Sequence, residues 1–196
     1  KSTLGLAVFR LVEADAGGFR LGGVPTDEMD LRALRERLAA VPQDPQLFEG
    51  TLRTNVDPFG AYDDAAVAEA LQKARCSSFF AGYLDARVDE GGANLSAGER
   101  QLLCFARVLL RSACLVLLDE ATSSIDSTTD AQIQAVLRSE VAAKATLLVI
   151  AHRIRTIETS DVVLVLADGK AAEFGPPADL LARPDGPFAR LVASSH

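Results

Sequence analysis

The stretch NLSAGERQLLCFARVLLRSACLVLLDEATSSID, residues 94–126, decides the fold of this chain. It predicts a polar turn that opens a helix, then the helix itself, and then an apolar strand at residues 115–118 that ends on Asp119 and Glu120. The strand shows no alternation of polar and apolar side chains, which is typical of a strand covered on both faces in a parallel sheet. We therefore expect an α/β protein with two carboxylates at the carboxyl end of a buried strand, where open α/β sheets bind ligands.

The two neighbouring carboxylates suit two different tasks, because successive side chains of a strand point to opposite faces. Asp119 is suited to hold a magnesium ion, directly or through water, and Glu120 to orient and polarise an attacking water. The plain alternative is that the pair only ends a strand and begins the next helix, since acidic residues are favoured near helix N-termini.

The start of the long helix also has two interpretations. Ser96 and Glu99 fit a capping box, with Ser96 as the N-cap and Glu99 as the third helical residue. The same helix start has free backbone amides and a glycine, Gly98, that permits close approach, which favours phosphate binding. Both interpretations can hold together.

These motifs resemble those of ATP-binding-cassette (ABC) ATPases. Residues 95–101 resemble the family's Leu-Ser-Gly-Gly-Gln signature, and residues 115–120 resemble its Walker B strand with the catalytic glutamate. The resemblance covers nearly the whole chain. It implies an α/β fold, namely a P-loop NTPase (RecA-like) core with a mostly parallel sheet and an inserted α-helical subdomain. It also implies ATP and Mg²⁺ as the ligands.

The signature departs from the family pattern at two positions. Glu99 stands where the family usually has glutamine, and Ala97 where it often has glycine. A carboxylate near a nucleotide phosphate is unfavourable unless it is turned away or paired. We therefore expect Glu99 to be turned away from the phosphate or to pair, for example with Arg100 or Arg107.

The chain opens with Lys1, Ser2 and Thr3, which resemble the end of a Walker A loop, Gly-x-x-x-x-Gly-Lys-Ser/Thr. The resemblance implies that Lys1 meets the β- and γ-phosphates, that Ser2 ligates magnesium and that Thr3 contacts the α-phosphate. The glycines whose amides cradle the phosphates are outside this sequence. We therefore expect a domain that is incomplete at its N-terminus and inactive when isolated.

Gln43 follows a predicted strand at residues 38–41 and matches the family's Q-loop glutamine. The resemblance implies that Gln43 contacts magnesium and senses the γ-phosphate. The plain alternative is a polar turn residue between Pro42 and Pro45.

Two further residues match loops of the family. His152 follows an apolar predicted strand, residues 146–150, and matches the H-loop histidine, which implies that it donates to the γ-phosphate and holds the attacking water. A structural histidine is the alternative. Asp126 matches the D-loop aspartate at the interface of two cassettes, and it is also a candidate N-cap of the following helix.

Residues 47–59 carry the most lineage-specific resemblance, to the second nucleotide-binding domain of exporters of the multidrug-resistance-associated (C) subfamily. In those exporters a segment ending Asn-Leu-Asp-Pro-Phe recurs. The chemistry of the stretch predicts turn and loop, and Pro58 excludes a helix at its position.

The rest of the pattern predicts one ABC ATPase domain over residues 1–196, with core segments 1–43 and 113–196 and a helical subdomain 44–112. After Lys73, helices with intervening loops are predicted to continue to Leu95, so we expect an all-α lobe inserted between two portions of the α/β core. The other predicted elements are helices from after Leu4 to Val12, at 31–37 (capped by Asp30), from Asp63 or Asp64 to Lys73, at 128–141 (with Ile133, Val136, Leu137 and Val141 buried) and two from Pro176 onward, and strands at 19–21, 161–166 and 169–174.

Composition excludes several classes of protein. The net charge of −7 and the pI of about 4.9 argue against a nucleic-acid binder. No apolar run approaches the roughly 20 residues needed to cross a bilayer. The three cysteines, Cys76, Cys104 and Cys114, are interpreted as reduced core residues of a cytosolic protein.

The function expected from this resemblance is the ATP-hydrolysing motor of an ABC membrane exporter, at the cytosolic face of a membrane. Its expected partners are the transmembrane domains of the transporter and a second nucleotide-binding domain in a head-to-tail ATP sandwich, with no nucleic acid. In that sandwich Ser96 and Gly98 serve the partner's nucleotide. Two alternatives are a nucleotide-sensing regulatory cassette of a channel or receptor-like assembly, and a soluble ABC protein of DNA repair or translation.

Overall fold

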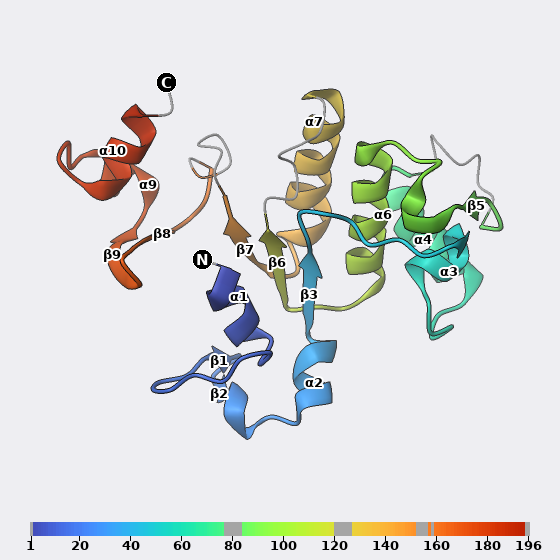
Figure 1. The fold of residues 1–196 in the computed structure, drawn as a ribbon, viewed down its shortest axis with the longest axis horizontal. Helices are drawn as coiled ribbons and strands as arrows, with labels where there is room; N and C mark the ends of the chain where they lie inside the picture. Colours follow the sequence, from blue (N-terminus) through green and yellow to red (C-terminus); the bar gives the residue numbers. More distant parts are fainter. Residues whose placement is uncertain (1, 77–83, 120–126, 152–156, 158, 195–196) are drawn as a thin grey trace. The chain divides into compact units, whose positions relative to one another are not determined.

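The computed structural model describes residues 2–76, 84–119, 127–151, 157 and 159–194 (Figure 1). The chain divides into two compact units, Ser2–Ile150 and Ala151–His196. In the first unit the elements are α1 (Ser2–Val8), β1 (Arg20–Leu21), β2 (Val24–Pro25), the 3₁₀ helix η1 (Thr26–Glu28), α2 (Leu31–Glu36), β3 (Leu38–Val41), β4 (Gly50–Thr51), α3 (Leu52–Val56), α4 (Asp64–Lys73), β5 (Arg87–Val88), the 3₁₀ helix η2 (Glu90–Gly92), α6 (Ala97–Leu110), β6 (Leu115–Asp119), α7 (Ser127–Val136), the π-helical turn η3 (Leu137–Val141) and β7 (Thr146–Ile150).

The centre of this unit is a parallel sheet with the strand order β3-β6-β7 (Figure 1). In register, Val41 lies opposite Leu118, and Asp119 lies opposite Ile150. The predicted strands at 38–41 and 146–150 are confirmed at both ends, and the strand predicted at 115–118 extends by one residue to Asp119. The carboxyl ends of the three strands therefore meet at one edge of the sheet.

Both faces of β6 are covered, as its unbroken apolar run predicts. Val116 and Leu118 belong to the large core cluster that also contains Leu102 and Phe105 of α6. Leu115 packs in a second cluster with residues of α1, α2 and β3. Because neighbouring strand residues point to opposite faces, these two clusters lie on opposite sides of the sheet.

The helices on the side of the sheet covered by α6 form as predicted, because each has a buried apolar face. Ser96 caps α6, and the apolar residues of that helix include Leu102, Leu103 and Phe105, each 0% exposed. The helix predicted at 128–141 is present as α7 followed by η3, and its predicted stripe of Ile133, Val136, Leu137 and Val141 is buried.

The N-terminal elements fill the other side of the sheet. α1 ends at Val8, short of the predicted end at residue 12, because Arg10 adopts a positive φ of 49° that a right-handed helix does not allow. β1 and β2 form a short antiparallel pair. Asp30 caps α2 as predicted, accepting a hydrogen bond from the backbone N–H of Ala33 at 2.9 Å.

The lobe between β3 and β6 is mostly helical, but the expectation of an all-α lobe is wrong. β4 and β5 form a two-stranded antiparallel ladder, with Gly50 opposite Val88 and Thr51 opposite Arg87. Val88 is fully buried, so the ladder contributes to the core of the lobe. The predicted amphipathic helix α4 is confirmed, with Asp63 as its N-cap.

The prediction of turn and loop across residues 47–59 is also wrong in part, because α3 lies inside this stretch. Thr51 and Thr54 form a capping box that starts the helix: the backbone N–H of each donates to the other's hydroxyl, at 2.9 and 3.1 Å. The helix ends at Val56, before Pro58, as the chemistry of proline requires.

The second unit contains β8 (Val163–Ala167), β9 (Lys170–Gly175), α9 (Pro177–Leu181) and α10 (Pro187–Ala193). β8 and β9 pair antiparallel, and Asp168 and Gly169 between them have φ values of 48° and 74°. Such a pair of positive φ angles is typical of a tight hairpin turn, as predicted at Gly169. Val163, Val165, Leu180 and Phe188 form the core of this unit.

The three cysteines are free thiols, but they do not share one environment. Cys76 and Cys104 are buried as predicted, whereas Cys114 is exposed. Cys114 directly precedes β6, where the chain turns at the surface, so its interpretation as a core residue is wrong. Among the described residues, no helix is long and apolar enough to span a membrane.

Candidate functional site

Two predicted site residues lie at the carboxyl edge of the parallel sheet. Asp119 is the last residue of β6 and is half-buried. Gln43 is exposed and follows β3 by two residues, and β3 is the strand that pairs with β6. The structure therefore brings Gln43 and Asp119 to neighbouring strand ends, as their positions in the sequence predict.

The helix α1 carries Ser2 and Thr3 toward the same edge. Gly5 packs on Leu117, the middle residue of β6. Val8, one turn further on, belongs to a cluster with Leu115 at the amino end of that strand. α1 therefore runs antiparallel to β6, and its first turn, with the exposed Ser2 and Thr3, lies toward the end that bears Asp119.

These side chains suit a magnesium ion that shares its coordination with water and phosphate. A hydroxyl from Ser2, an amide oxygen from Gln43 and a carboxylate from Asp119 are all oxygen ligands, which Mg²⁺ prefers. Within the described ranges, no three His, Cys, Asp or Glu side chains are grouped so that they could hold a metal ion. A single carboxylate fits Mg²⁺, which is usually held by one or two carboxylates together with substrate phosphates.

Four predicted site residues lie outside the described residues, namely Lys1, Glu120, Asp126 and His152. Their roles stay predictions from the sequence.

The start of α6 is a complete capping box. The hydroxyl of Ser96 accepts from the backbone N–H of Glu99 at 3.2 Å, and the carboxylate of Glu99 accepts from the backbone N–H of Ser96 at 2.7 Å. The suggested pairing of Glu99 with Arg100 or Arg107 is not the one found. Arg100 donates instead to the carbonyl oxygen of Leu95 at 2.8 Å. A backbone amide thus stabilises the carboxylate that departs from the family signature.

Gly98 permits a close approach, but within this chain the approach is to α7. A Cβ added at Gly98 would lie 2.5 Å from Cγ2 of Thr129. The glycine is therefore required where the first turns of α6 and α7 pack together. Ser96, two residues earlier, is exposed.

Two polar residues of α6 that hold the segment after β3, Gln101 and Arg107, were not predicted from the sequence. Gln101 is 1% exposed, and its side-chain N–H donates to the carbonyl oxygen of Pro42 at 3.2 Å. Arg107 donates from Nη1 to the carbonyl oxygen of Gln46 and from Nε to that of Asn55, both at 2.7 Å. Burial lowers the pKa of Arg107 below its usual value. The signal that could have found them is a polar side chain on the apolar face of a helix.

Asn55 completes this polar framework in the lobe. It is 1% exposed, accepts from the backbone N–H of Phe48 at 3.0 Å and donates to the carbonyl oxygen of Phe48 at 2.8 Å. The guanidinium of Arg107 lies 6.0 Å from the centre of the Phe48 ring. The two hydrogen bonds with Asn55 thus fix the backbone of Phe48, although the residue itself is 62% exposed.

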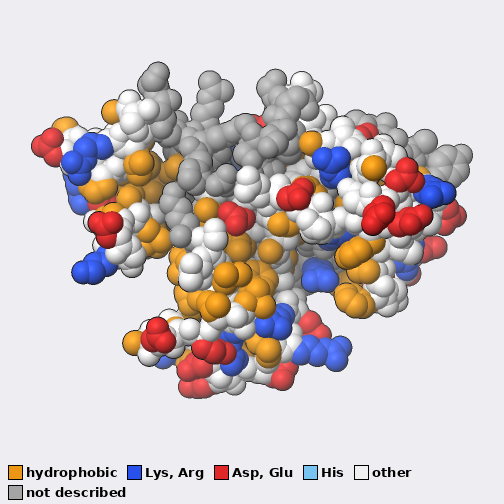
Figure 2. All heavy atoms as spheres, in the orientation of Figure 1, with side chains coloured by type: hydrophobic (Ala, Val, Ile, Leu, Met, Phe, Trp, Pro, Cys, Tyr) orange, Lys and Arg blue, Asp and Glu red, His pale blue; other side chains and the backbone are white. Residues whose placement is uncertain are grey.

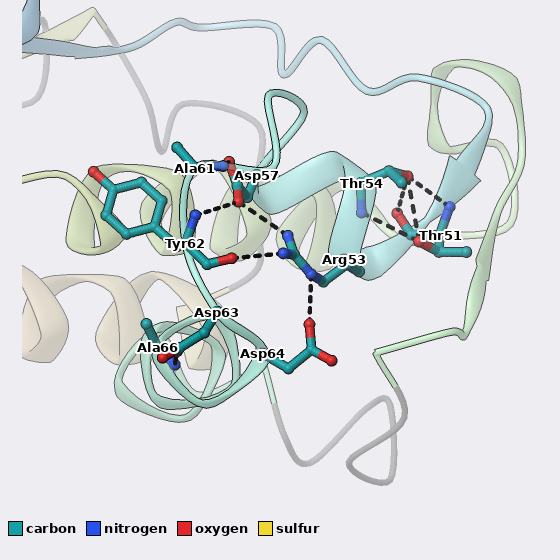
Figure 3. Close-up of polar contacts among 9 residues, drawn as sticks. All are labelled: Thr51, Arg53, Thr54, Asp57, Ala61, Tyr62, Asp63, Asp64 and Ala66. Carbon is teal, nitrogen blue, oxygen red and sulfur yellow. Dashed lines mark hydrogen bonds and ion pairs between the residues drawn. The ribbon is translucent and has the colours of Figure 1, made fainter.

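A second buried polar group, Asp57, organises the loop after α3 (Figure 3). Its carboxylate accepts from the backbone N–H groups of Ala61 and Tyr62 at 3.1 and 2.9 Å and from Arg53 at 3.0 Å. Arg53 also donates to Asp64 at 2.7 Å and to the carbonyl oxygen of Tyr62 at 2.6 Å. Burial acts to raise the pKa of Asp57, but the hydrogen bonds outweigh it and hold that pKa below its usual value.

Comparisons with known proteins agree with the resemblance read from the sequence. The model of a protein family described as "ABC transporter" matches residues 1–123. "ABC transporter C family member 9" of Arabidopsis thaliana is 46% identical over 195 residues, which are 98% of this chain and 13% of that protein. "ATP-binding cassette sub-family C member 2" of Rattus norvegicus is 45% identical over 184 residues, which are 92% of this chain and 12% of that protein. The chain thus spans only a small part of the length of these relatives.

A solved structure shares the fold. "Structure of a bacterial Atm1-family ABC exporter with ATP bound" matches with a TM-score of 0.90 and 36% identity, over 100% of this chain and 34% of that chain. This likeness confirms the predicted fold class, an α/β P-loop NTPase core with a parallel sheet and an inserted helical lobe.

Proposed function

Because this chain belongs to the ABC transporter family, we propose that it is the ATP-binding and ATP-hydrolysing motor domain of a membrane exporter. The observation that carries the proposal is that Gln43 and Asp119 lie at the carboxyl ends of two neighbouring parallel strands, with the first turn of α1, which bears Ser2, directed toward the same edge. The names of the similar proteins, which are transporters of the C family and an ATP-bound exporter, support it.

When bound, ATP with Mg²⁺ would supply the phosphoryl group that is transferred to water. On this proposal Ser2, Gln43 and Asp119 hold the magnesium ion. Lys1 and Thr3 bind the phosphates, and the ammonium group of Lys1 balances part of their charge. Most of the catalytic effect then comes from positioning and charge stabilisation.

Two further residues would act on the attacking water. Glu120 orients that water and accepts its proton, and His152 donates a hydrogen bond to the γ-phosphate. Both roles come from the matching motifs in the sequence.

The first proposed partner is a second nucleotide-binding domain in a head-to-tail sandwich. Ser96, Gly98 and Asp126 would face the partner's nucleotide across the interface. The exposure of Ser96 at the start of α6 supports this role. The carboxylate of Glu99 accepts from the backbone N–H of Ser96 at this helix start, which gives the departing signature residue a hydrogen-bond partner within its own chain.

The second proposed partner is the set of transmembrane domains of the same transporter, which would place this domain at the cytosolic face of a membrane. Phe48 and Phe59 are 62% and 84% exposed, and Figure 2 shows hydrophobic side chains at the surface of the lobe. Exposed aromatic residues on a backbone fixed by Asn55 and Asp57 are typical of a protein contact.

We also propose that residues 1–196 act as one ABC ATPase domain, with core segments 1–43 and 113–196 and a helical subdomain 44–112. The two alternative functions are not favoured. The regulatory cassette drew support from Glu99, which the capping box accommodates. A soluble protein of repair or translation would not match the transporter names of the relatives.

Phosphate release by the purified full-length protein in lipid vesicles tests the proposal. We expect hydrolysis of ATP that depends on Mg²⁺ and stops when EDTA removes the ion. Phosphate release no faster in the unsubstituted protein than in a Glu120→Gln variant would contradict it.

A further inference from the structure

α6 holds the backbone next to Gln43 by a partly buried hydrogen bond from a buried side chain. Pro42 follows the last residue of β3, Val41, whose partner in the sheet is Leu118. The carbonyl oxygen of Pro42 accepts from the side chain of Gln101 at 3.2 Å, and Gln101 is 1% exposed. A buried amide group is costly to leave unpaired, so this bond fixes the backbone from which Gln43 extends.

The same helix holds the segment again a few residues later. Arg107 donates to the carbonyl oxygens of Gln46 and Asn55. The loop that leaves the sheet at Pro42 is therefore fastened to α6 at two points, on either side of residues 43–45. Of these two contacts, the one from Gln101 is adjacent to the proposed magnesium ligand.

We propose that Gln101 is a positioning residue, which keeps Gln43 in place for magnesium by holding the carbonyl group of Pro42. Through this bond α6 links the signature at its start to the metal-side loop of the same chain. The inference rests on the proposed function, because it takes Gln43 as a magnesium ligand and Ser96 as a contact to the partner's nucleotide.

The linkage has a physical basis in the packing of α6. Ser96 and Glu99 fix the first turn of the helix by the capping box, and Gln101 lies in the next turn. Its neighbours Leu102 and Leu103 are 0% exposed, so the helix cannot turn about its axis without disturbing the core. A displacement of the helix start is thus passed to Pro42 as a displacement of the same element.

The first test measures the backbone in the nucleotide-free, full-length protein. Gln101→Met keeps the size of the side chain and removes the N–H donor. We expect amide hydrogen exchange at Gln43, Asp44 and Gln46 to become about fivefold faster, the effect of one lost hydrogen bond. Leu103→Met is the matched control on the same helix, because it changes a buried side chain without removing a hydrogen bond.

The second test asks whether Gln101 acts through Gln43. Binding of trinitrophenyl-ATP is titrated with Mg²⁺ in the unsubstituted protein, in Gln101→Met, in Gln43→Ala and in the double variant. We expect Gln101→Met to raise the half-saturating Mg²⁺ concentration about fivefold. In the Gln43→Ala background the same substitution should have no further effect, because the ligand it positions is gone.

Three results would overturn the inference. Equal exchange rates in Gln101→Met and Leu103→Met would show that the bond does not hold the loop. An unchanged Mg²⁺ requirement, or equal effects of Gln101→Met with and without Gln43, would show that Gln101 does not act through Gln43. If the unsubstituted full-length protein neither binds nor hydrolyses ATP, the proposed function itself fails, which separates that failure from the others.

Discussion

Gly5 and Leu117 are in direct contact, because a Cβ at Gly5 would lie 2.7 Å from Cδ2 of Leu117. This contact brings α1 onto β6 and sets how far the first turn of the helix reaches toward Asp119. The relationship makes the absence of a side chain at residue 5 a requirement of the site's geometry.

Gly5→Val is therefore expected to lower the free energy of unfolding by about 1–3 kcal/mol, the usual cost of overpacking a core. Leu6→Val is the control, since Leu6 is 43% exposed and the change tests only helix propensity. Thermal or urea unfolding measures both. Adding Leu117→Ala to Gly5→Val should recover part of the loss, and strictly additive losses would contradict the contact.

Asp57 and Asp64 both accept hydrogen bonds from Arg53, and their different burial predicts different losses of folding stability when each is replaced. Asp57 has a side chain 3% exposed and accepts from two backbone amides, whereas that of Asp64 is 76% exposed. Asp57→Ala should cost about 1–3 kcal/mol because it removes three hydrogen bonds made by a buried carboxylate. Asp64→Ala should cost less than about 1 kcal/mol, as is usual for exposed pairs. Urea unfolding decides, and equal costs would contradict the assigned role of Asp57.

The lowered pKa of Asp57 predicts how stability depends on pH. Its folded pKa lies below the unfolded value, so the folded state binds fewer protons in the interval between them. The contribution is complete above the unfolded pKa, about 3.9, and is lost as the pH falls through the folded pKa. Unfolding free energies of the unsubstituted protein and Asp57→Asn should therefore converge below about pH 4. A constant difference down to acidic pH would refute this.

The thiols should react selectively. Burial raises the pKa of Cys76 to about 12 and also raises that of Cys104, so both stay protonated and shielded at neutral pH. Cys114 is exposed. Iodoacetamide at pH 8 should label Cys114 in the folded protein, with the other two labelled only after unfolding. Peptide mass spectrometry reads the sites, and Cys114→Ser is the control in which none of these three positions should be labelled in the folded protein.

Glu120→Gln tests the proposed base in the full-length protein. The substitution keeps the shape of the side chain and removes its ability to accept a proton. ATP should still bind, while turnover should fall by about 100-fold or more. Phosphate release and retention of radiolabelled ATP measure the two effects, with the exposed Glu90→Gln as the control. Normal phosphate release by Glu120→Gln would show that another group is the base.

The sequence predicted best those elements whose side chains have a clear period or an unbroken apolar run. The strands at 38–41 and 146–150 and the buried stripe of α7 and η3 agree with the structure, because burial alone determines those patterns. β4 and β5 were missed since two residues are too few to show alternation. α3 was missed because its capping box uses threonine at both positions.

Site residues were likewise predicted where a local pattern of the sequence marks them, and missed where none does. Gln43 and Asp119 were predicted at one edge because strand ends of a parallel sheet meet there. The capping box of Ser96 and Glu99 is confirmed, whereas the suggested arginine partner of Glu99 is wrong, because its carboxylate accepts from the backbone N–H of Ser96. Gln101 was missed because its acceptor, the carbonyl oxygen of Pro42, lies 59 positions away in the chain, and no local pattern records such a contact.

The length of α6 gives its two fastenings a mechanical consequence. A helix of 14 residues is about 21 Å long at a rise of about 1.5 Å per residue. Tilting such a rod by about 5° about its midpoint moves each end by about 1 Å in opposite directions. A small displacement of Ser96 at the start of such a tilting helix would therefore move the end near Arg107 in the opposite direction. Arg107 contacts the loop at Gln46 and α3 at Asn55, so both contacts would move with it.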